Sequence, residues 1–321
     1  MQEQLSNSND LYNRKVCIIG SGYVGSSITY ALMMKELAHE IILIDVQREK
    51  AEAEVLDIRH GIPFMGSAVI RVGEYSDISK ANLIIVTAGR NRRPGESRLD
   101  LAADNVNTAN DVSKLIEKNY TSGVVLVVTN PNDVVTYKMS ERLGLPPGTV
   151  FGTGCMLDES RLVNVIADYV GLKQDIISAQ VIGEHGDSKV PLWSKTSIAG
   201  IHIREYCNAM NLAFDSETRI MMEQKVLEMG STIIRGKQRT HYGISTCVCY
   251  IADAILNRRA TISCVTSALN NEYGISDVAL SLPTIIDHMG ATKRMEEYIT
   301  DFELERLKKS AQIIKDVLHK V

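Results

Sequence analysis

The sequence contains no apolar run close to the roughly 20 residues that a membrane-spanning helix needs. Its first residues, MQEQLSNSNDLYNR, are polar and lack the charged and then apolar order of a signal peptide. A basic excess is also missing, because the formal net charge is -4, and binding to a phosphate backbone depends on cationic side chains. We therefore expect a cytoplasmic protein whose partners include neither a membrane nor a nucleic acid.

Spacings typical of metal sites are missing too. The two nearest of the six cysteines, Cys247 and Cys249, have neither the two-residue gap nor the partner cluster of a zinc site. No two of the seven histidines form a His-x-x-x-His pair. The sequence thus predicts no metal site, and it predicts reduced thiols in the core.

The first half of the sequence does contain a regular alternation of short apolar runs with amphipathic stretches. The apolar runs, KVCIIG, EIILID, AVIRV, NLIIVTAG and GVVLVVTN, are too continuous to have a solvated face. This pattern predicts βαβ units around a parallel sheet, and hence a doubly wound α/β domain over residues 1–151.

The second half has a different pattern of apolar residues. Longer helical periods, such as residues 218–234, alternate with strand-like runs that are close enough for antiparallel pairing. We expect an α+β domain over residues 152–321, ending in a helix that opens with a capping box of Thr300 and Glu303. A chain of 321 residues exceeds what one core usually organises, which favours two domains and allows a cleft between them.

Three glycines, Gly20, Gly22 and Gly25, follow the first apolar run in the G-x-G-x-x-G spacing. The motif alone is weak, and an ordinary glycine turn would explain it. An amphipathic helix comes next, and then a strand that ends at Asp45, whose carboxylate can accept hydrogen bonds from ribose hydroxyls. We therefore predict a dinucleotide site, and NAD as the cofactor, because Asp45 would repel the 2′-phosphate of NADP; Arg48, three residues on, keeps NADP open.

Three polar segments, TNPNDVV, GCMLDESRL and VIGEHGDSKVPLWS, have simple structural explanations when each is taken alone. Together they offer what a nicotinamide enzyme acting on a 2-oxo acid needs: a proton donor, a group that orients it and a guanidinium for the carboxylate. Asp158 and Arg161 are three residues apart and so lie on one helical face. His185 lies between Gly183 and Gly186, where the backbone can approach a substrate closely.

At these motifs the sequence resembles the lactate/malate dehydrogenase family, from Lys15 to the C-terminal helix. The matching segments are GSGYVG, LID, RPGESRLDL, TNPNDV, LDESR, GEHGDSKVPLWS and THYGI, in the family's order. The resemblance implies an NAD-dependent L-2-hydroxy acid dehydrogenase with a Rossmann domain followed by a substrate domain. It also implies a small 2-oxo or 2-hydroxy acid as substrate, and a homodimer or homotetramer.

The resemblance further implies a catalytic set. His185 would be the proton donor and acceptor, and Asp158 would orient it and stabilise the imidazolium. Arg98, in a loop that closes over the substrate, would polarise the reacting carbonyl.

The remaining roles that the resemblance implies concern binding. Arg161 would bind the substrate carboxylate, Asn130 would contact both cofactor and substrate, and Thr240 would line the substrate pocket. The expected cofactor-binding residues are Gly20, Gly22, Tyr23, Val24, Gly25, Asp45, Thr87, Ala88, Gly89 and Asn130.

Arg92 occupies the position at which the family discriminates between substrates, with Gln typical of lactate enzymes and Arg typical of malate enzymes. A guanidinium closed over pyruvate would face a methyl group, whereas oxaloacetate brings a second carboxylate to it. Arg92 therefore favours malate and oxaloacetate. Glu184 in GEHGDS and Thr240 in THYGI instead resemble the lactate branch, so lactate and pyruvate are the alternative, as is an Arg92 that points to solvent.

Two arginines depart from the family pattern. Arg90 replaces a usual alanine, and Arg239 stands just before Thr240 where small residues are usual. Either arginine could reshape the pocket, contact the adenosine or point outward. The alternative from another functional class is a catalytically silent NAD-binding protein, and the intact catalytic set argues against it.

Overall fold

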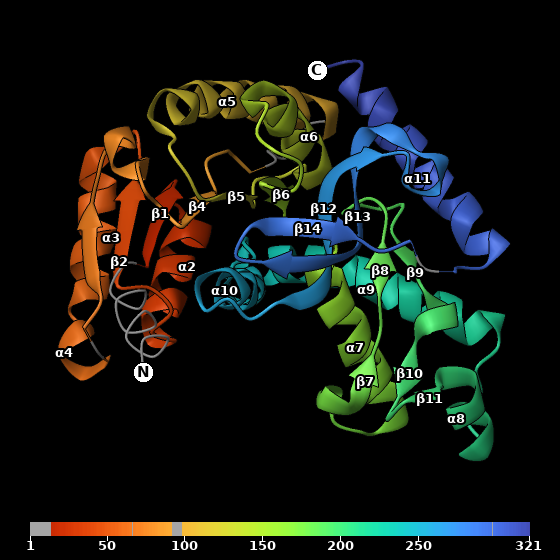
Figure 1. Ribbon diagram of the computed structural model, residues 1–321. Coiled ribbons are helices and arrows are strands. Elements are labelled where there is room, and N and C mark those ends of the chain that lie inside the picture. The colour runs from red at the N-terminus through yellow and green to blue at the C-terminus, as the bar shows by residue number, and fades with distance from the viewer. Residues whose placement is uncertain (1–13, 66, 92–97, 297) are drawn as a thin grey trace, which may run out of the picture.

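The computed structural model describes residues 14–321 apart from residues 66, 92–97 and 297, and it describes only the backbone of Arg98 (Figure 1). Its central feature is a nine-stranded sheet in the order β14-β13-β12-β6-β5-β4-β1-β2-β3. Helices cover both faces of the sheet's parallel part, and the rest of the C-terminal half packs beside its antiparallel part.

The first six strands are parallel, in the spatial order 3-2-1-4-5-6 of a doubly wound dinucleotide-binding sheet. Their bounds are β1 (Lys15–Ile19), β2 (Glu40–Ile44), β3 (Val69–Val72), β4 (Leu83–Val86), β5 (Val124–Val127) and β6 (Val150–Gly152). Every residue of β4 and of β5 is buried, which explains their continuous apolar sequences. The prediction of a doubly wound α/β domain is confirmed.

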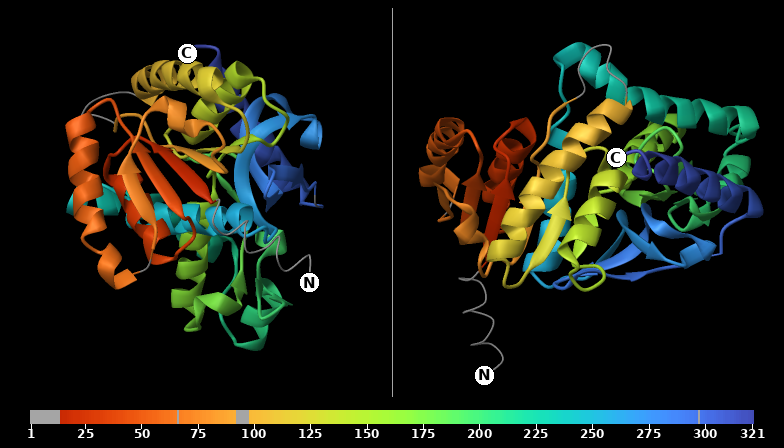
Figure 2. Two further views of the ribbon diagram at one scale, coloured as in Figure 1. Left: turned by 60° about the vertical axis from the view of Figure 1, so that its left-hand side comes forward. Right: turned by 90° about the horizontal axis from the view of Figure 1, so that it is seen from above.

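Successive side chains of each strand enter two different cores. Val16 and Ile18 of β1 pack with the helices of one face, and Cys17 and Ile19 pack with those of the other. On the first face lie α2 (Tyr23–Met34), α3 (Arg48–Arg59) and α10 (Tyr242–Leu256); on the second lie α5 (Arg98–Asn119) and α6 (Asn132–Leu143), which run side by side in Figure 2.

Three antiparallel strands extend this sheet beyond β6. They are β12 (Thr261–Asn270), β13 (Ser276–Asp287) and β14 (Gly290–Arg294), and β12 joins β6 through the pairing of Thr266 with Gly152. The α+β character predicted for the second half is confirmed. The sequence did not indicate that both halves would share one continuous sheet, because strand pairing between distant segments leaves no local pattern.

The second half also builds its own core against β12 and β13. Its helices are α7 (Met156–Val170), α8 (Ile203–Ala209), α9 (Ser216–Lys237) and α11 (Asp301–Leu318). Two small antiparallel sheets complete it: one contains β7 (Ile177–Ser178), β10 (Ser197–Ile198) and β11 (Ile201–His202), and the other contains β8 (Val181–Ile182) and β9 (Val190–Pro191). The segment between β8 and β9 carries His185.

The short helical elements are α4 (Ile62–Met65), η1 (Tyr75–Ile78), η2 (Gln174–Ile176), η3 (Trp193–Lys195) and η4 (Glu272–Gly274). Within the residues that the structure describes, no helix combines the length and the apolar character needed to cross a membrane. All six cysteine thiols are free and buried, as predicted from their scattered positions.

Helix α11 begins with the predicted capping box. The Thr300 hydroxyl accepts a hydrogen bond from the backbone N–H of Glu303, and the Glu303 carboxylate accepts one from the backbone N–H of Thr300. The buried Glu303 carboxylate also accepts two hydrogen bonds from Ser194, so the cap ties the helix to the segment after β9.

We expect Thr300→Ala to lower the free energy of unfolding by about 1 kcal/mol, because it leaves the first turn of α11 without its cap. Urea denaturation followed by far-UV circular dichroism measures this change. Ser231→Ala, at an exposed position inside α9, is the matched control and should change stability by less than about 0.5 kcal/mol. Equal stability of the two variants would contradict the role of the cap.

Candidate active site

The glycine motif forms a tight turn between β1 and α2. A Cβ atom on Gly25 would lie 1.9 Å from the carbonyl oxygen of Gly20, and one on Gly20, whose φ is +106°, would lie 2.8 Å from the backbone nitrogen of Ala88. At Gly22, by contrast, a Cβ would meet nothing within 4 Å. The turn is therefore closed on the protein side and open in front of the helix N-terminus, which is the cradle that a pyrophosphate needs.

The N-terminus of α2 supplies donors for that cradle. Tyr23 and Val24 are its first two residues, and the first N–H groups of a helix have no partner inside the helix. The Tyr23 side chain is exposed. Both predicted residues thus lie at the open side of the glycine turn, and their contact with the cofactor stays a prediction.

Asp45 follows β2 and is bound to the same turn. Its Oδ2 accepts hydrogen bonds from the backbone N–H and the hydroxyl of Ser21, at 2.6 and 2.8 Å, and its Oδ1 accepts one from Gln47. Burial acts to raise the pKa of Asp45, but these hydrogen bonds outweigh it and lower the pKa. The carboxylate is therefore charged at neutral pH and held beside the glycine turn, where ribose hydroxyls could donate to it.

The carboxyl ends of β4 and β5 meet at the same edge of the sheet. Thr87, Ala88 and Gly89 follow β4, and the Thr87 hydroxyl donates to the carbonyl of Gly20 at 2.9 Å. Asn130 follows β5 and has an exposed side chain, while its backbone carbonyl accepts from Asn105 at 2.6 Å. The structure therefore brings the predicted cofactor-binding residues together at one edge.

His185 and Asp158 form a direct pair between the β8–β9 segment and the first turn of α7. The distance from His185 Nδ1 to Asp158 Oδ2 is 2.7 Å, and the Asp158 side chain is fully buried. The backbone N–H of His185 donates to Asp133 Oδ2, also at 2.7 Å. The ring is thus fixed at its backbone and at one nitrogen, which leaves its Nε2 edge for a substrate.

The other oxygen of Asp158 binds two cations. Asp158 Oδ1 lies 3.1 Å from an Arg161 guanidinium nitrogen and 2.7 Å from Lys189 Nζ. Burial alone would raise the pKa of Asp158, but the charge and hydrogen bond of His185, followed by those of Lys189, hold it well below its usual range. A single buried carboxylate therefore binds the side chains of His185, Arg161 and Lys189.

Arg161 and Thr240 line one cavity of about 460 Å³ between α7, the end of α9 and the start of α10. The cavity is next to the His185–Asp158 pair, because Arg161 lines the cavity and also binds Asp158. Two of the four predicted substrate-binding residues, Arg161 and Thr240, thus line one cavity, and Asn130 is not in its lining.

The sequence analysis missed two charged residues of this site, Asp133 and Lys189. Asp133 is almost fully buried, its carboxylate accepts from His185 N and from the Thr266 hydroxyl, and burial raises its pKa. Lys189 is also buried. The one available signal for Lys189 was its place directly before the apolar run VPLW, at the start of a buried strand.

The two unusual arginines have different environments. Arg90 forms an ion pair with Asp104 of α5 at 2.8 Å, so it contacts the helix that follows the substrate loop. Arg239 lies over the Tyr23 ring, with its Cζ 3.9 Å from the ring centroid. Arg239 therefore reaches the N-terminus of α2 from the second half of the chain, and it does not point away from the cofactor cradle.

Two predicted residues of the substrate loop cannot be placed. Arg92 lies outside the described residues, and so does the side chain of Arg98, whose backbone begins α5. Their roles, and closure of the segment from Gly89 to Asp100 over the substrate, stay predictions; the last three residues of that segment belong to α5. In the described part of the chain, no cluster of three or more His, Cys, Asp or Glu side chains has the arrangement of a metal site.

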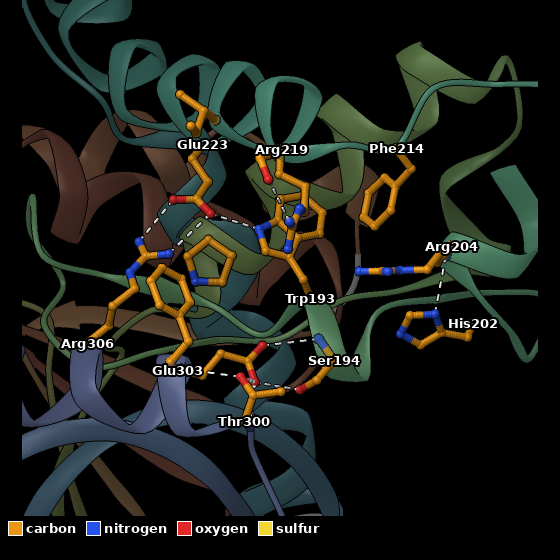
Figure 3. Close-up of a pocket in the computed structure, with 14 residues that line it drawn as sticks. Trp193, Ser194, His202, Arg204, Phe214, Arg219, Glu223, Thr300, Glu303 and Arg306 are labelled. Carbon is orange, nitrogen blue, oxygen red and sulfur yellow. Dashed lines mark hydrogen bonds and ion pairs between the residues drawn. The ribbon is translucent and has the colours of Figure 1, made fainter. Parts of the chain in front are cut away.

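A second cavity of about 570 Å³ lies in the C-terminal half between α9, α11 and the segment after β9 (Figure 3). Arg306 binds Glu223 through two nitrogens on one wall, and Trp193 donates its indole N–H to the same carboxylate at 2.7 Å. The Trp193 and Phe214 rings pack edge to face beside it. Its lining includes none of the predicted site residues.

Comparison with known proteins places this geometry in a family. The model of the lactate/malate dehydrogenase NAD binding domain matches residues 14–152, and that of the lactate/malate dehydrogenase alpha/beta C-terminal domain matches residues 155–321. The L-lactate dehydrogenase of Thermoanaerobacter sp. (strain X514) is 39% identical over 308 residues, which cover 96% of this chain and 99% of the relative. That of Acetivibrio thermocellus is 35% identical, covering 97% and 98%.

Solved structures agree with the sequence comparison. The minor L-lactate dehydrogenase of Enterococcus mundtii, in a ligand-bound form, superposes with a TM-score of 0.92 at 36% identity, covering 96% of this chain and 98% of the other. The L-lactate dehydrogenase of Clostridium thermocellum superposes with a TM-score of 0.83 at 39% identity, covering 96% and 99%. Together with the glycine cradle and the His185–Asp158 pair, these matches show that the chain belongs to the NAD-dependent lactate/malate dehydrogenase family.

Proposed function

We propose that this protein is an NAD-dependent L-2-hydroxy acid dehydrogenase that interconverts L-lactate and pyruvate. The observation that carries the proposal is the 2.7 Å pair of His185 with the fully buried Asp158, with Arg161 bound to the same carboxylate. The names of the similar proteins support lactate as the substrate. We also propose the division into domains at residues 151–152 and a homodimer or homotetramer, as the sequence predicts.

The residues of the site suggest how the reaction proceeds. NAD, when bound, supplies and accepts the hydride. With Nδ1–H of His185 donating to Asp158, the imidazole can move a proton at Nε2 to or from the substrate oxygen, and the buried carboxylate stabilises the charged ring. Arg161 can bind the substrate carboxylate through its guanidinium, and Arg98 would polarise the carbonyl.

A preference for malate and oxaloacetate, which Arg92 predicts, is the second candidate function. The similar proteins named above are L-lactate dehydrogenases, so the comparisons favour the lactate alternative. The observation in favour of malate is the arginine itself, because a second substrate carboxylate would pair with it. Both candidates use the same hydride and proton transfer.

We expect His185→Gln to lower kcat for pyruvate reduction by at least 100-fold, because it removes the proton donor but keeps a side chain of similar size. The affinity for NADH, measured by fluorescence titration, should change little, because the cofactor cradle lies around Gly20 and Gly22. Turnover near the wild-type rate would exclude His185 as the proton donor. A wild-type protein that bound NADH but reduced no 2-oxo acid would instead support the catalytically silent alternative.

We expect kcat/KM for NADH oxidation to be higher with pyruvate than with oxaloacetate at neutral pH, in accord with the lactate dehydrogenases that the chain resembles. The measurement should include Arg92→Gln, with Arg93→Gln as the neighbouring control. If Arg92 points to solvent, neither variant changes the ratio of the two kcat/KM values. A preference of about 100-fold for oxaloacetate that is lost in Arg92→Gln alone would instead show malate specificity.

A further inference from the structure

Lys189 is the second side chain, after His185, that the segment between β8 and β9 brings to Asp158. Its Nζ donates to Asp158 Oδ1 at 2.7 Å, and its side chain is only 10% exposed. His185 binds Oδ2 of the same carboxylate. A lysine amino group is rarely buried without a function or a strong partner, and here the partner is the carboxylate that holds the proposed proton donor.

The backbone around Lys189 fixes this geometry from two sides. On one side, β9 pairs with β8 directly after Lys189, through Val190 and Ile182. On the other side, the Lys189 carbonyl accepts from Arg306 at 3.2 Å, and Figure 3 shows Arg306 held by Glu223. The lysine side chain is thus directed at Asp158 by a rigid frame.

The charge of Lys189 opposes the effect of Asp158 on His185. A buried carboxylate stabilises a protonated imidazole, because charges interact strongly where water is excluded. Cations bound to the other oxygen of the carboxylate offset part of the negative potential at the imidazole. They also repel the positive charge of a protonated imidazole. A histidine that faces a shared carboxylate is therefore protonated less readily than one that faces an unshared carboxylate.

We propose that Lys189 is a positioning residue that shares the Asp158 carboxylate with His185 and so sets the pH range in which the enzyme reduces and oxidises its substrate. This inference rests on the proposed function of His185. It goes beyond the pairing of His185 with Asp158, because it assigns the pH limits of reduction and of oxidation to a third side chain.

Other charged and titratable groups face this pair and would remain in a Lys189 variant. Helix α6 contributes Asp133, whose Oδ2 accepts from the His185 backbone N–H, and the β8–β9 segment contributes Glu184, whose charge acts on Asp133. Helix α7 contributes Arg161, which binds Asp158 Oδ1. The thiols of Cys155 and Cys247, whose pKa values burial raises, also lie near Asp158. Since Arg161 stays on Asp158 Oδ1, the carboxylate keeps a cationic partner when Lys189 is replaced.

The test compares Lys189→Met, Lys189→Gln and Lys189→Arg across pH 5 to 10 in both directions. Reduction needs the protonated histidine and oxidation needs the neutral one. Removing the lysine charge favours the protonated form, so the alkaline limit of pyruvate reduction and the acid limit of lactate oxidation should both move up by about one pH unit. Above the alkaline limit of the wild type, the rate of pyruvate reduction by Lys189→Met, taken relative to its own maximum, should be up to tenfold higher than that of the wild type. Below the acid limit, its relative rate of lactate oxidation should be up to tenfold lower.

The three variants separate charge from packing. Met keeps the length and removes the charge, Gln keeps a hydrogen-bond donor without the charge, and Arg keeps the charge. We expect Met and Gln to shift both limits and Arg to restore the wild-type limits. If Lys189 only supports packing, the Met and Gln variants would reduce pyruvate and oxidise lactate more slowly, with the pH limits of both reactions unchanged. That outcome would overturn the proposal. Lys308→Met, at an exposed position of α11, is the matched control and should leave both profiles unchanged.

A readout that does not depend on turnover separates this inference from the proposed function. The titration of the His185 ring, followed by NMR in wild type and in Lys189→Met, should move to higher pH in the variant. An unmoved titration would overturn the inference even in an active enzyme. A moved titration in a protein that reduces no 2-oxo acid would support the effect of Lys189 on His185 and refute the proposed function.

Discussion

The active site depends on one buried negative charge. A carboxylate removed from water is costly unless cations and hydrogen bonds compensate it, and Asp158 has no exposed surface. Its partners come from two segments: Arg161 lies one turn along α7, while His185 and Lys189 lie between β8 and β9. Loss of any of these three partners would leave the buried charge less compensated, so the same interactions stabilise the fold and fix the proposed proton donor.

The frame around this charge extends through both halves of the chain. Strand β12 joins the parallel sheet at β6, and its Thr266 donates to Asp133, which in turn accepts from the His185 backbone. Helix α10 packs on the face of the sheet that also carries α2. The glycine turn and the His185–Asp158 pair are therefore held at a fixed separation by shared secondary structure, which suits a reaction that needs two reactants in contact.

A third connection between the two halves of the chain joins the segment before α10 to helix α2, close to the glycine turn. The His241 ring accepts or donates a hydrogen bond at 2.9 Å with the Ser27 hydroxyl of α2, and Arg239 lies over Tyr23. Both residues adjoin Thr240, which lines the cavity with Arg161. Contacts at the first turns of α2 thus reach the proposed substrate pocket through a single short segment.

The sequence by itself determined the features whose signals are local. Continuous apolar runs that alternate with amphipathic stretches gave the parallel strands, the spacing of Gly20, Gly22 and Gly25 gave the turn, and a three-residue spacing put Asp158 and Arg161 on one helix face. Only the tertiary structure brought His185 to Asp158, joined the two halves in one sheet and turned Lys189 inward. A lysine in a polar loop has the same sequence pattern whether it faces solvent or a buried carboxylate, because the distinction depends on what distant segments pack against it.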